Sequence, residues 1–160
     1  MAESARLSGR ANGAFVIAAI LTLWQQAVAV SADAGKGPLG VCPQPRKTQQ
    51  APSEFLSRTN PLPATPTHIQ AGKKLYMETA NPLACAQCHG NSGDGQGVLG
   101  AALMPPPRNF TCGKAMKDLS DGQLFWIIKN GSPGTGMMAF PGMPDDEAWE
   151  LVHYIRSLAR

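Results

Sequence analysis

A five-residue segment with the pattern C-x-x-C-H constrains this 160-residue chain more than any other: it is Cys85-Ala86-Gln87-Cys88-His89. Two thiols three positions apart, followed directly by an imidazole, are typical of c-type haem attachment. The thiols can add to the two vinyl groups on one edge of the porphyrin, and the histidine then reaches the iron. The segment therefore predicts one haem c, bound covalently through Cys85 and Cys88, with His89 as an axial ligand.

Two other kinds of site use cysteines at this spacing, and the sequence supports neither. A thioredoxin-like redox dithiol needs a strand followed by a helix, and no stretch of the chain alternates as a strand does. A zinc site needs a second close pair of ligands. The remaining cysteines, Cys42 and Cys112, stand alone.

Residues 1–34 have the three parts of a secretory signal peptide. Arg6 and Arg10 precede an apolar run over residues 14–24, and small residues follow up to Ala34. The run is about half of the roughly 20 residues that span a bilayer, so we expect export with cleavage. An uncleaved leader that anchors the protein to the membrane is the alternative. Because bacteria assemble haem c outside the cytoplasm, the leader and the haem motif together predict a periplasmic protein.

Residues 35–66 form a proline-rich extension that holds seven of the fourteen prolines. Few apolar residues are interleaved, so we expect an extended, irregular segment without a core of its own. It is either a flexible tether or a strap around the folded domain. Cys42 favours the strap, because two leftover cysteines in an oxidising compartment are expected to pair, here Cys42 with Cys112. Two free or intermolecular thiols are the alternative.

Residues 67–160 predict an all-α domain of three main helices joined by long loops rich in glycine and proline. Capping-box patterns open helices over 67–80 and 120–130, beginning at Thr67 and Ser120. A third helix over 145–159 begins with acidic residues and carries an apolar stripe. The stripe consists of Ala148, Leu151, Val152, Ile155, Leu158 and Ala159. A bound haem explains how loops as long as 90–117 and 131–144 stay ordered.

The sequence resembles class I mono-haem cytochromes c of the small bacterial periplasmic kind, over about residues 69–158. The likeness rests on the segments Gly72–Tyr76, Cys85–Gly90, Gly134–Phe140 and Trp149–Leu158. The resemblance implies the cytochrome c fold, in which the first and last helices cross near one haem. Glycine inside a helix costs about 1 kcal/mol against alanine, and a close helix crossing beside Tyr154 would explain Gly72.

The second axial ligand is expected from the loop that folds over the other face of the haem. Met137, Met138 and Met143 all lie there, and thioether sulfur stabilises ferrous iron. The family pattern Gly-Thr-x-Met-Pro-Ala-Phe selects Met137. Met138 stands where the family usually has proline, so Met138 and Met143 remain alternatives. A bis-histidine haem with His68 or His153 is a weaker alternative.

The loop after the haem motif holds two further features. Residues 95–100 match G-x-G-x-x-G, but they follow the haem motif and not a strand, so we assign them no nucleotide. The resemblance also implies that a backbone carbonyl at Pro105 or Pro106 accepts the second N–H of the His89 imidazole. Such a bond fixes the ring and makes it more basic.

These observations predict a periplasmic electron-transfer protein with no enzymatic activity, in which His89 and Met137 ligate the iron. The alternative is a haem-bearing subunit docked to a periplasmic dehydrogenase or a membrane oxidase or reductase. A haem gas sensor or haem enzyme would need a labile Met137–iron bond. We expect redox partner proteins and no small-molecule substrate. A net charge of +3 is too small and too scattered for nucleic acid. Lysines that could steer an acidic partner are Lys73, Lys74, Lys114, Lys117 and Lys129.

Overall fold

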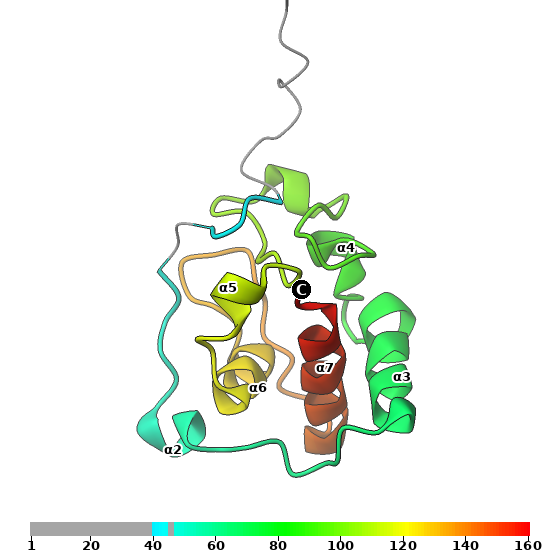
Figure 1. The fold of residues 1–160 in the computed structure, drawn as a ribbon. Helices are drawn as coiled ribbons and strands as arrows, with labels where there is room; N and C mark the ends of the chain where they lie inside the picture. Colours follow the sequence, from blue (N-terminus) through cyan, green and yellow to red (C-terminus); the bar gives the residue numbers. More distant parts are fainter. Residues whose placement is uncertain (1–39, 45–46) are drawn as a thin grey trace, which may run out of the picture. The chain divides into compact units, whose positions relative to one another are not determined.

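The computed structural model describes residues 40–44 and 47–160, and the predicted signal peptide lies outside them. Within these residues the regular structure is helical and no strand occurs, which confirms the all-α prediction. The main helices in Figure 1 are α3 (Pro66–Lys74), α6 (Asp121–Asn130) and α7 (Asp145–Leu158). Shorter elements are α2 (Ser53–Leu56), α4 (Ala86–His89), α5 (Gly113–Met116), a π-helical turn η1 (Leu75–Thr79) and a 3-10 turn η2 (Gly100–Ala102). Among the described helices, none combines the length and apolar character that a membrane span requires.

Helix α3 begins one residue before the predicted cap. The hydroxyl of Thr65, and not that of Thr67, caps the helix by accepting the backbone N–H of His68 at 3.3 Å. Pro66 fills the first helical position, where its missing N–H costs nothing. Thr67 therefore lies inside the helix. After Lys74 the chain widens into η1, so helical structure reaches Thr79, close to the predicted end.

Helix α6 begins and ends where the sequence predicts. The Ser120 hydroxyl accepts the Gln123 backbone N–H at 3.1 Å, and Gly131 ends the helix with a φ of +74°. The Gln123 side chain does not complete the capping box. Its oxygen accepts the Ala51 N–H at 2.8 Å and its amide donates to the Gln49 carbonyl at 3.1 Å. A buried side chain of the helix thus fixes the proline-rich extension.

Helices α3 and α7 cross in close contact at Gly72. A Cβ at this position would lie 2.0 Å from the Glu150 carbonyl oxygen, so only glycine lets the two backbones approach this closely. The crossing is therefore at Glu150, one turn before the predicted position beside Tyr154. Tyr154 instead packs against Tyr76 of η1, with 5.1 Å between ring centroids.

The core lies along the inner face of α7. Four residues of the predicted stripe, Ala148, Leu151, Val152 and Ile155, are buried. Leu158 and Ala159 pack against the core but are only partly buried. Trp149 joins the core and stacks on Phe125 of α6, with ring centroids 4.2 Å apart. Packing against α3 on one side and α6 on the other holds α7 in place.

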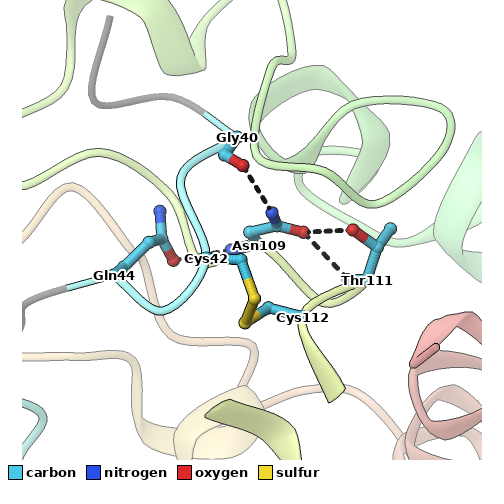
Figure 2. Close-up of a disulfide and its surroundings, with 6 residues drawn as sticks. All are labelled: Gly40, Cys42, Gln44, Asn109, Thr111 and Cys112. Carbon is cyan, nitrogen blue, oxygen red and sulfur yellow. Dashed lines mark hydrogen bonds between the residues drawn. A yellow bond between two sulfur atoms is a disulfide. The ribbon is translucent and has the colours of Figure 1, made fainter. Parts of the chain in front are cut away.

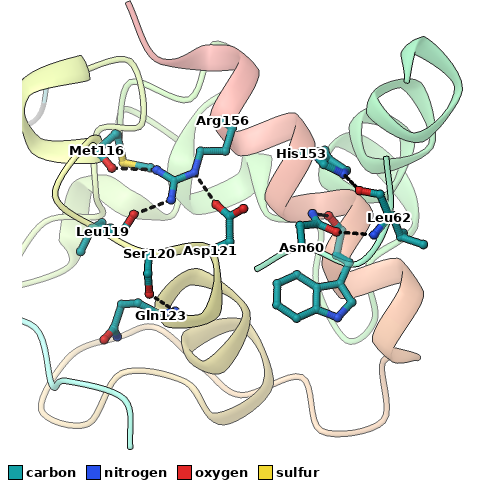
Figure 3. Close-up of polar contacts among 10 residues, drawn as sticks. Asn60, Leu62, Met116, Leu119, Ser120, Asp121, Gln123, His153 and Arg156 are labelled. Carbon is teal, nitrogen blue, oxygen red and sulfur yellow. Dashed lines mark hydrogen bonds and ion pairs between the residues drawn. The ribbon is translucent and has the colours of Figure 1, made fainter. Parts of the chain in front are cut away.

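The described part of the proline-rich extension, residues 40–44 and 47–65, is a strap and not a loose tether. In Figure 1 it runs from residue 40 to α2 and then on to the start of α3. Its Asn60 amide donates to the Trp149 carbonyl at 2.9 Å, and its Leu62 carbonyl contacts His153 Nε2 at 2.9 Å (Figure 3). Phe55 of α2, a helical turn that the sequence did not predict, packs on Phe125. The strap therefore follows the surface of α6 and α7.

The first end of the strap is joined to the loop before α5. Cys42 and Cys112 form a disulfide, with Cα atoms 5.4 Å apart and 70 residues between them in sequence (Figure 2). Beside it the Asn109 amide donates to the Gly40 carbonyl at 3.0 Å, and the Asn109 backbone N–H donates to Gln44 Oε1 at 2.8 Å. The disulfide and these hydrogen bonds hold the two segments together.

Replacing Cys42 and Cys112 together with alanine should lower the free energy of unfolding. Closing a loop of 70 residues restricts the unfolded chain, and the chain-entropy model gives about 4 kcal/mol for such a loop. Urea unfolding of the haem-loaded protein, followed by circular dichroism, measures the change. Reducing the wild type should lower its stability by a similar amount. A reduced wild type as stable as the oxidised one would contradict the prediction.

Arg156 ties the end of α7 to α5 and α6. Its Nε contacts the Asp121 carboxylate at 2.8 Å, and its guanidinium donates to the Met116 carbonyl at 2.7 Å and to the Leu119 carbonyl (Figure 3). The guanidinium thus satisfies two carbonyls at the turn between α5 and α6. It fixes the position of Leu119, which lines the cavity described below.

Candidate haem site

One cavity contains all four predicted site residues. It has a volume of about 1080 Å³, including the part open to solvent, and Cys85, Cys88, His89 and Met137 all line it. Most of its other lining residues are apolar, among them Leu83, Leu103, Phe110, Leu124, Ile127, Ile128, Phe140, Leu151 and Ile155. An apolar cavity with two thiols, an imidazole and a thioether in its lining suits a porphyrin with its iron.

The short helix α4 arranges the haem motif. Cys85 lies at its N-terminal cap, and its carbonyl accepts the His89 N–H at 2.9 Å. One helical turn brings Cys85 and Cys88 to the same face. Burial raises the pKa of Cys85 to about 12 and also raises that of Cys88.

A thiol with a raised pKa does not suit a reactive dithiol, whose nucleophile is the thiolate. In the part of the chain that the structure describes, no group of three or more histidine, cysteine, aspartate or glutamate side chains could hold a metal ion. The arrangement therefore favours covalent addition to a porphyrin over a redox dithiol or a zinc site.

The G-x-G-x-x-G segment packs directly on the haem motif. The Leu99 backbone N–H donates to the Gln87 carbonyl at 2.8 Å, and the Gly97 N–H donates to the Cys88 carbonyl at 3.1 Å. A Cβ would lie 2.4 Å from the Gln87 oxygen at Gly97, and 2.3 Å from the Cys88 oxygen at Gly100. These glycines allow close backbone contact, and no strand precedes them in the described residues. Their position explains the pattern without a nucleotide.

The His89 imidazole is held by a backbone carbonyl, but not at the predicted position. Nδ1 lies 3.0 Å from the carbonyl oxygen of Arg108, whereas the resemblance implies a carbonyl at Pro105 or Pro106. The difference arises because the Phe110 N–H donates to the Gly93 carbonyl at 2.7 Å. That bond brings the residues just after the prolines, and not the prolines themselves, to the imidazole.

Two aromatic residues that the sequence did not single out support the histidine. Phe110 is buried and stacks on the His89 ring, with centroids 4.4 Å apart and an angle of 20° between the planes. The buried Tyr76 hydroxyl donates to the Gly90 carbonyl at 2.8 Å. Burial raises the pKa of Tyr76, so its hydroxyl stays a donor. Tyr76 shows no sequence sign of this role beyond its place on the first helix.

The methionine loop, residues 131–144, contributes to the lining of the same cavity as the haem motif. Met137 and Met138 both line the cavity, whereas Met143 is buried in the core and is not part of the lining. The loop around Met137 is fixed by its own hydrogen bonds: its N–H donates to the Thr135 hydroxyl at 3.1 Å, and its carbonyl accepts the Ser132 N–H at 3.0 Å. The geometry thus favours the first two methionines over Met143.

The other candidate residues lie elsewhere. His68 contacts Glu150 at 3.0 Å, and neither His68 nor His153 lines the cavity. Lys129 is only partly exposed; its Nζ contacts the Asp145 carboxylate at 2.9 Å and the Met143 carbonyl. The other four lysines predicted to steer a partner are exposed: Lys73, Lys74, Lys114 and Lys117. Two histidines and one lysine are thus engaged within the fold.

Comparisons with known proteins agree with this geometry. Residues 67–155, more than half of the chain, match the family model described as cytochrome c oxidase, cbb3-type, subunit III. Over 104 residues the chain is 32% identical to a thiosulfate dehydrogenase of Stutzerimonas stutzeri (strain A1501), covering 62% of this chain and 30% of that protein.

A solved structure also resembles this chain in fold and sequence. A chain of a reducing HAO-like protein complex of Kuenenia stuttgartiensis superposes with a TM-score of 0.54 and 36% identity, covering 62% of this chain and 47% of that one. The chain thus spans less than half the length of either relative. With its helical fold and its C-x-x-C-H cavity, the chain belongs to the cbb3-type subunit III family of c-type cytochromes, carries haem c and has an electron-transfer role.

Proposed function

We propose that the protein is a periplasmic electron carrier in which Cys85 and Cys88 would hold the haem covalently and His89 and Met137 would be the ligands of its iron. The observation that carries this proposal is that all four side chains line one largely apolar cavity. When bound, haem supplies an iron that takes up one electron in the ferric state and releases it in the ferrous state.

His89 is oriented for ligation by the residues around it. Because its Nδ1 donates to the Arg108 carbonyl, Nε2 is the nitrogen assigned to the iron. The carbonyl fixes the tautomer and increases the basicity of the ring. The stacked Phe110 ring restricts rotation of the imidazole. These contacts prepare the ligand in one orientation, as fast electron transfer without rearrangement requires.

Met137 supplies the second ligand from the methionine loop. Its thioether favours ferrous iron and so raises the reduction potential. Two strong ligands leave no position for a gas or a substrate, which is the basis for proposing a carrier and not a haem sensor or enzyme. The apolar residues around the ligands exclude water, which strengthens the same preference for the ferrous state, the less charged form.

We further propose that the chain is exported and that it matures in the periplasm. Residues 1–34 would act as the signal peptide, residues 35–66 as the extension and residues 67–160 as the cytochrome domain. The disulfide between Cys42 and Cys112 supports this location, because disulfides persist in oxidising compartments.

A second candidate is a subunit docked to a larger redox enzyme. The names of the two relatives, a dehydrogenase and a protein complex, favour it. So do large apolar side chains exposed next to the haem motif or the cavity, Leu99 and Met138. The size at which the native protein elutes distinguishes a small free carrier from a complex.

Replacing Met137 with alanine tests the ligand assignment. The ferric wild type should show the weak long-wavelength band of sulfur-to-iron charge transfer, and the variant should lose it, because alanine removes the proposed thioether ligand. Met143→Ala is the matched control and should keep the band. Loss in Met138→Ala but not in Met137→Ala would assign the ligand to Met138. A wild type without the band would overturn methionine ligation and favour the sensor, enzyme or bis-histidine alternatives.

A further inference from the structure

The haem cavity contains a single charged residue that the proposed function does not use. Among the described residues that line the cavity, Arg108 alone carries a permanent charge. The other lining residues are apolar, or neutral and polar such as Gln123, Ser132 and Thr135. A guanidinium at the edge of a cavity can form paired hydrogen bonds with an anion such as the carboxylate of a bound ligand. Haem brings two such anions, because its propionate groups end in carboxylates.

The position of the Arg108 guanidinium is set by the strap. Its Nη2 donates to the Thr48 hydroxyl at 2.7 Å, and Thr48 also lines the cavity. A threonine hydroxyl that accepts one hydrogen bond still has its own proton to donate. The pair therefore offers both guanidinium and hydroxyl donors, an arrangement that suits a carboxylate.

The strap is fixed on both sides of Thr48. Before it, the Gln44 amide donates to the Pro107 carbonyl at 2.8 Å and its oxygen accepts the Asn109 N–H at 2.8 Å. After it, the buried Gln123 side chain holds the Gln49 carbonyl and the Ala51 N–H. Hydrogen bonds of Gln44, and of Gln49 and Ala51, thus hold described residues of the strap before and after Thr48.

We propose that the strap completes the haem site: Thr48 orients the Arg108 guanidinium so that the pair binds a haem propionate carboxylate. This inference rests on the proposed attachment of haem at Cys85 and Cys88. The strap lies before residue 67, outside the residues that match the family model. The extension is therefore part of the cofactor site, besides being a structural brace.

This arrangement has a consequence for the reduction potential. A positive charge near the iron favours the ferrous state, and a propionate without a partner favours the ferric state. Replacing Arg108 with glutamine removes the cation but leaves the backbone carbonyl that holds His89. The Arg108→Gln potential should therefore lie below the wild-type potential. Thr48→Val should shift the potential in the same direction by less, and Thr48→Ser should restore it, because serine keeps the hydroxyl.

The experiment compares these variants with Arg58→Gln in the full-length haem-loaded protein. Arg58 is also on the strap and its guanidinium lies over the Phe55 ring, but it is not among the residues that line the cavity. Spectroelectrochemical titration gives each potential, and resonance Raman gives the propionate bending band. Arg108→Gln should lower the potential and shift this band, and Arg58→Gln should do neither.

Equal potentials and unshifted bands in Arg108→Gln and Arg58→Gln would overturn the inference. If the Arg108→Gln protein does not accumulate, the two Thr48 variants provide the test instead. Equal reduction potentials and equal propionate bands in Thr48→Val and Thr48→Ser would also overturn the inference. Covalent haem on a denaturing gel and the sulfur-to-iron band, measured on the same samples, report separately on the proposed function. Their absence from the wild type would reject that function, whereas their presence with an unmoved potential would reject only the role of Arg108 and Thr48.

Discussion

Replacing Cys85 and Cys88 together with alanine should abolish covalent haem attachment and leave most of the chain unfolded. The cavity of about 1080 Å³ lies between the haem motif, the methionine loop and α6 and α7. Without a covalently held haem, its apolar lining would face water, at about 25 cal/mol for each Å² of apolar surface. The loops over residues 90–117 and 131–144 would also lose the group that they surround. Haem staining after denaturing electrophoresis and far-ultraviolet circular dichroism measure the two effects.

The control for this prediction is the Cys42→Ala, Cys112→Ala protein, which also lacks two cysteines. It should keep its haem stain and its helical spectrum, with lower stability, because neither residue lines the cavity. A Cys85→Ala, Cys88→Ala protein that retains covalent haem would refute attachment at these thiols. One that loses haem but keeps the full helical spectrum would show that the polypeptide alone can close the cavity.

The main helices could be predicted because local patterns determine them. The stripe along α7, the acidic first turn and the Ser120 cap are readable from residues a few positions apart, and each was confirmed. The haem motif is equally local, since Cys85, Cys88 and His89 lie within one helical turn. Properties that depend on neighbouring residues are therefore accessible to sequence reasoning.

The contacts between distant segments could not be predicted in the same way. The carbonyl that holds His89 belongs to Arg108 because of a hydrogen bond between Phe110 and Gly93. No periodicity signals such a bond. Gln123 matches a capping box, yet its side chain instead binds the strap, since a buried amide finds better partners there than at its own helix end. Tertiary contacts decided both cases.

The course of the strap could be predicted from composition, but its contribution to the cavity could not. Its prolines and the expected pairing of Cys42 with Cys112 favour a segment that wraps the domain, and the described residues do wrap it. Composition did not indicate that Thr48 reaches the haem cavity, because one threonine in a proline-rich segment has no distinguishing pattern. A segment predicted as a tether or a strap thus supplies one residue to the lining of the cavity.

Replacing Gly72 with alanine should destabilise the protein by about 3 kcal/mol, the upper end of the cost of overpacking. In an exposed helix the same change would stabilise by about 1 kcal/mol, because alanine is the better helix former. Here the new Cβ would stand 2.0 Å from the Glu150 carbonyl oxygen and 2.5 Å from its carbon. These are backbone atoms of α7 and cannot rotate away, so α3 and α7 must separate.

Separation of α3 and α7 would also displace core residues that contact the haem site. Leu151 follows Glu150 directly and lines the cavity, and Tyr76 continues from α3 to hold the Gly90 carbonyl. We therefore expect Gly72→Ala to lower both the midpoint of urea unfolding and the yield of haem-loaded protein. Gly142→Ala is the matched control, because nothing lies within 4 Å of the position of its Cβ. If both variants were as stable as the wild type, the helices would tolerate separation, and the close crossing at Gly72 could not be what positions α7 against the haem.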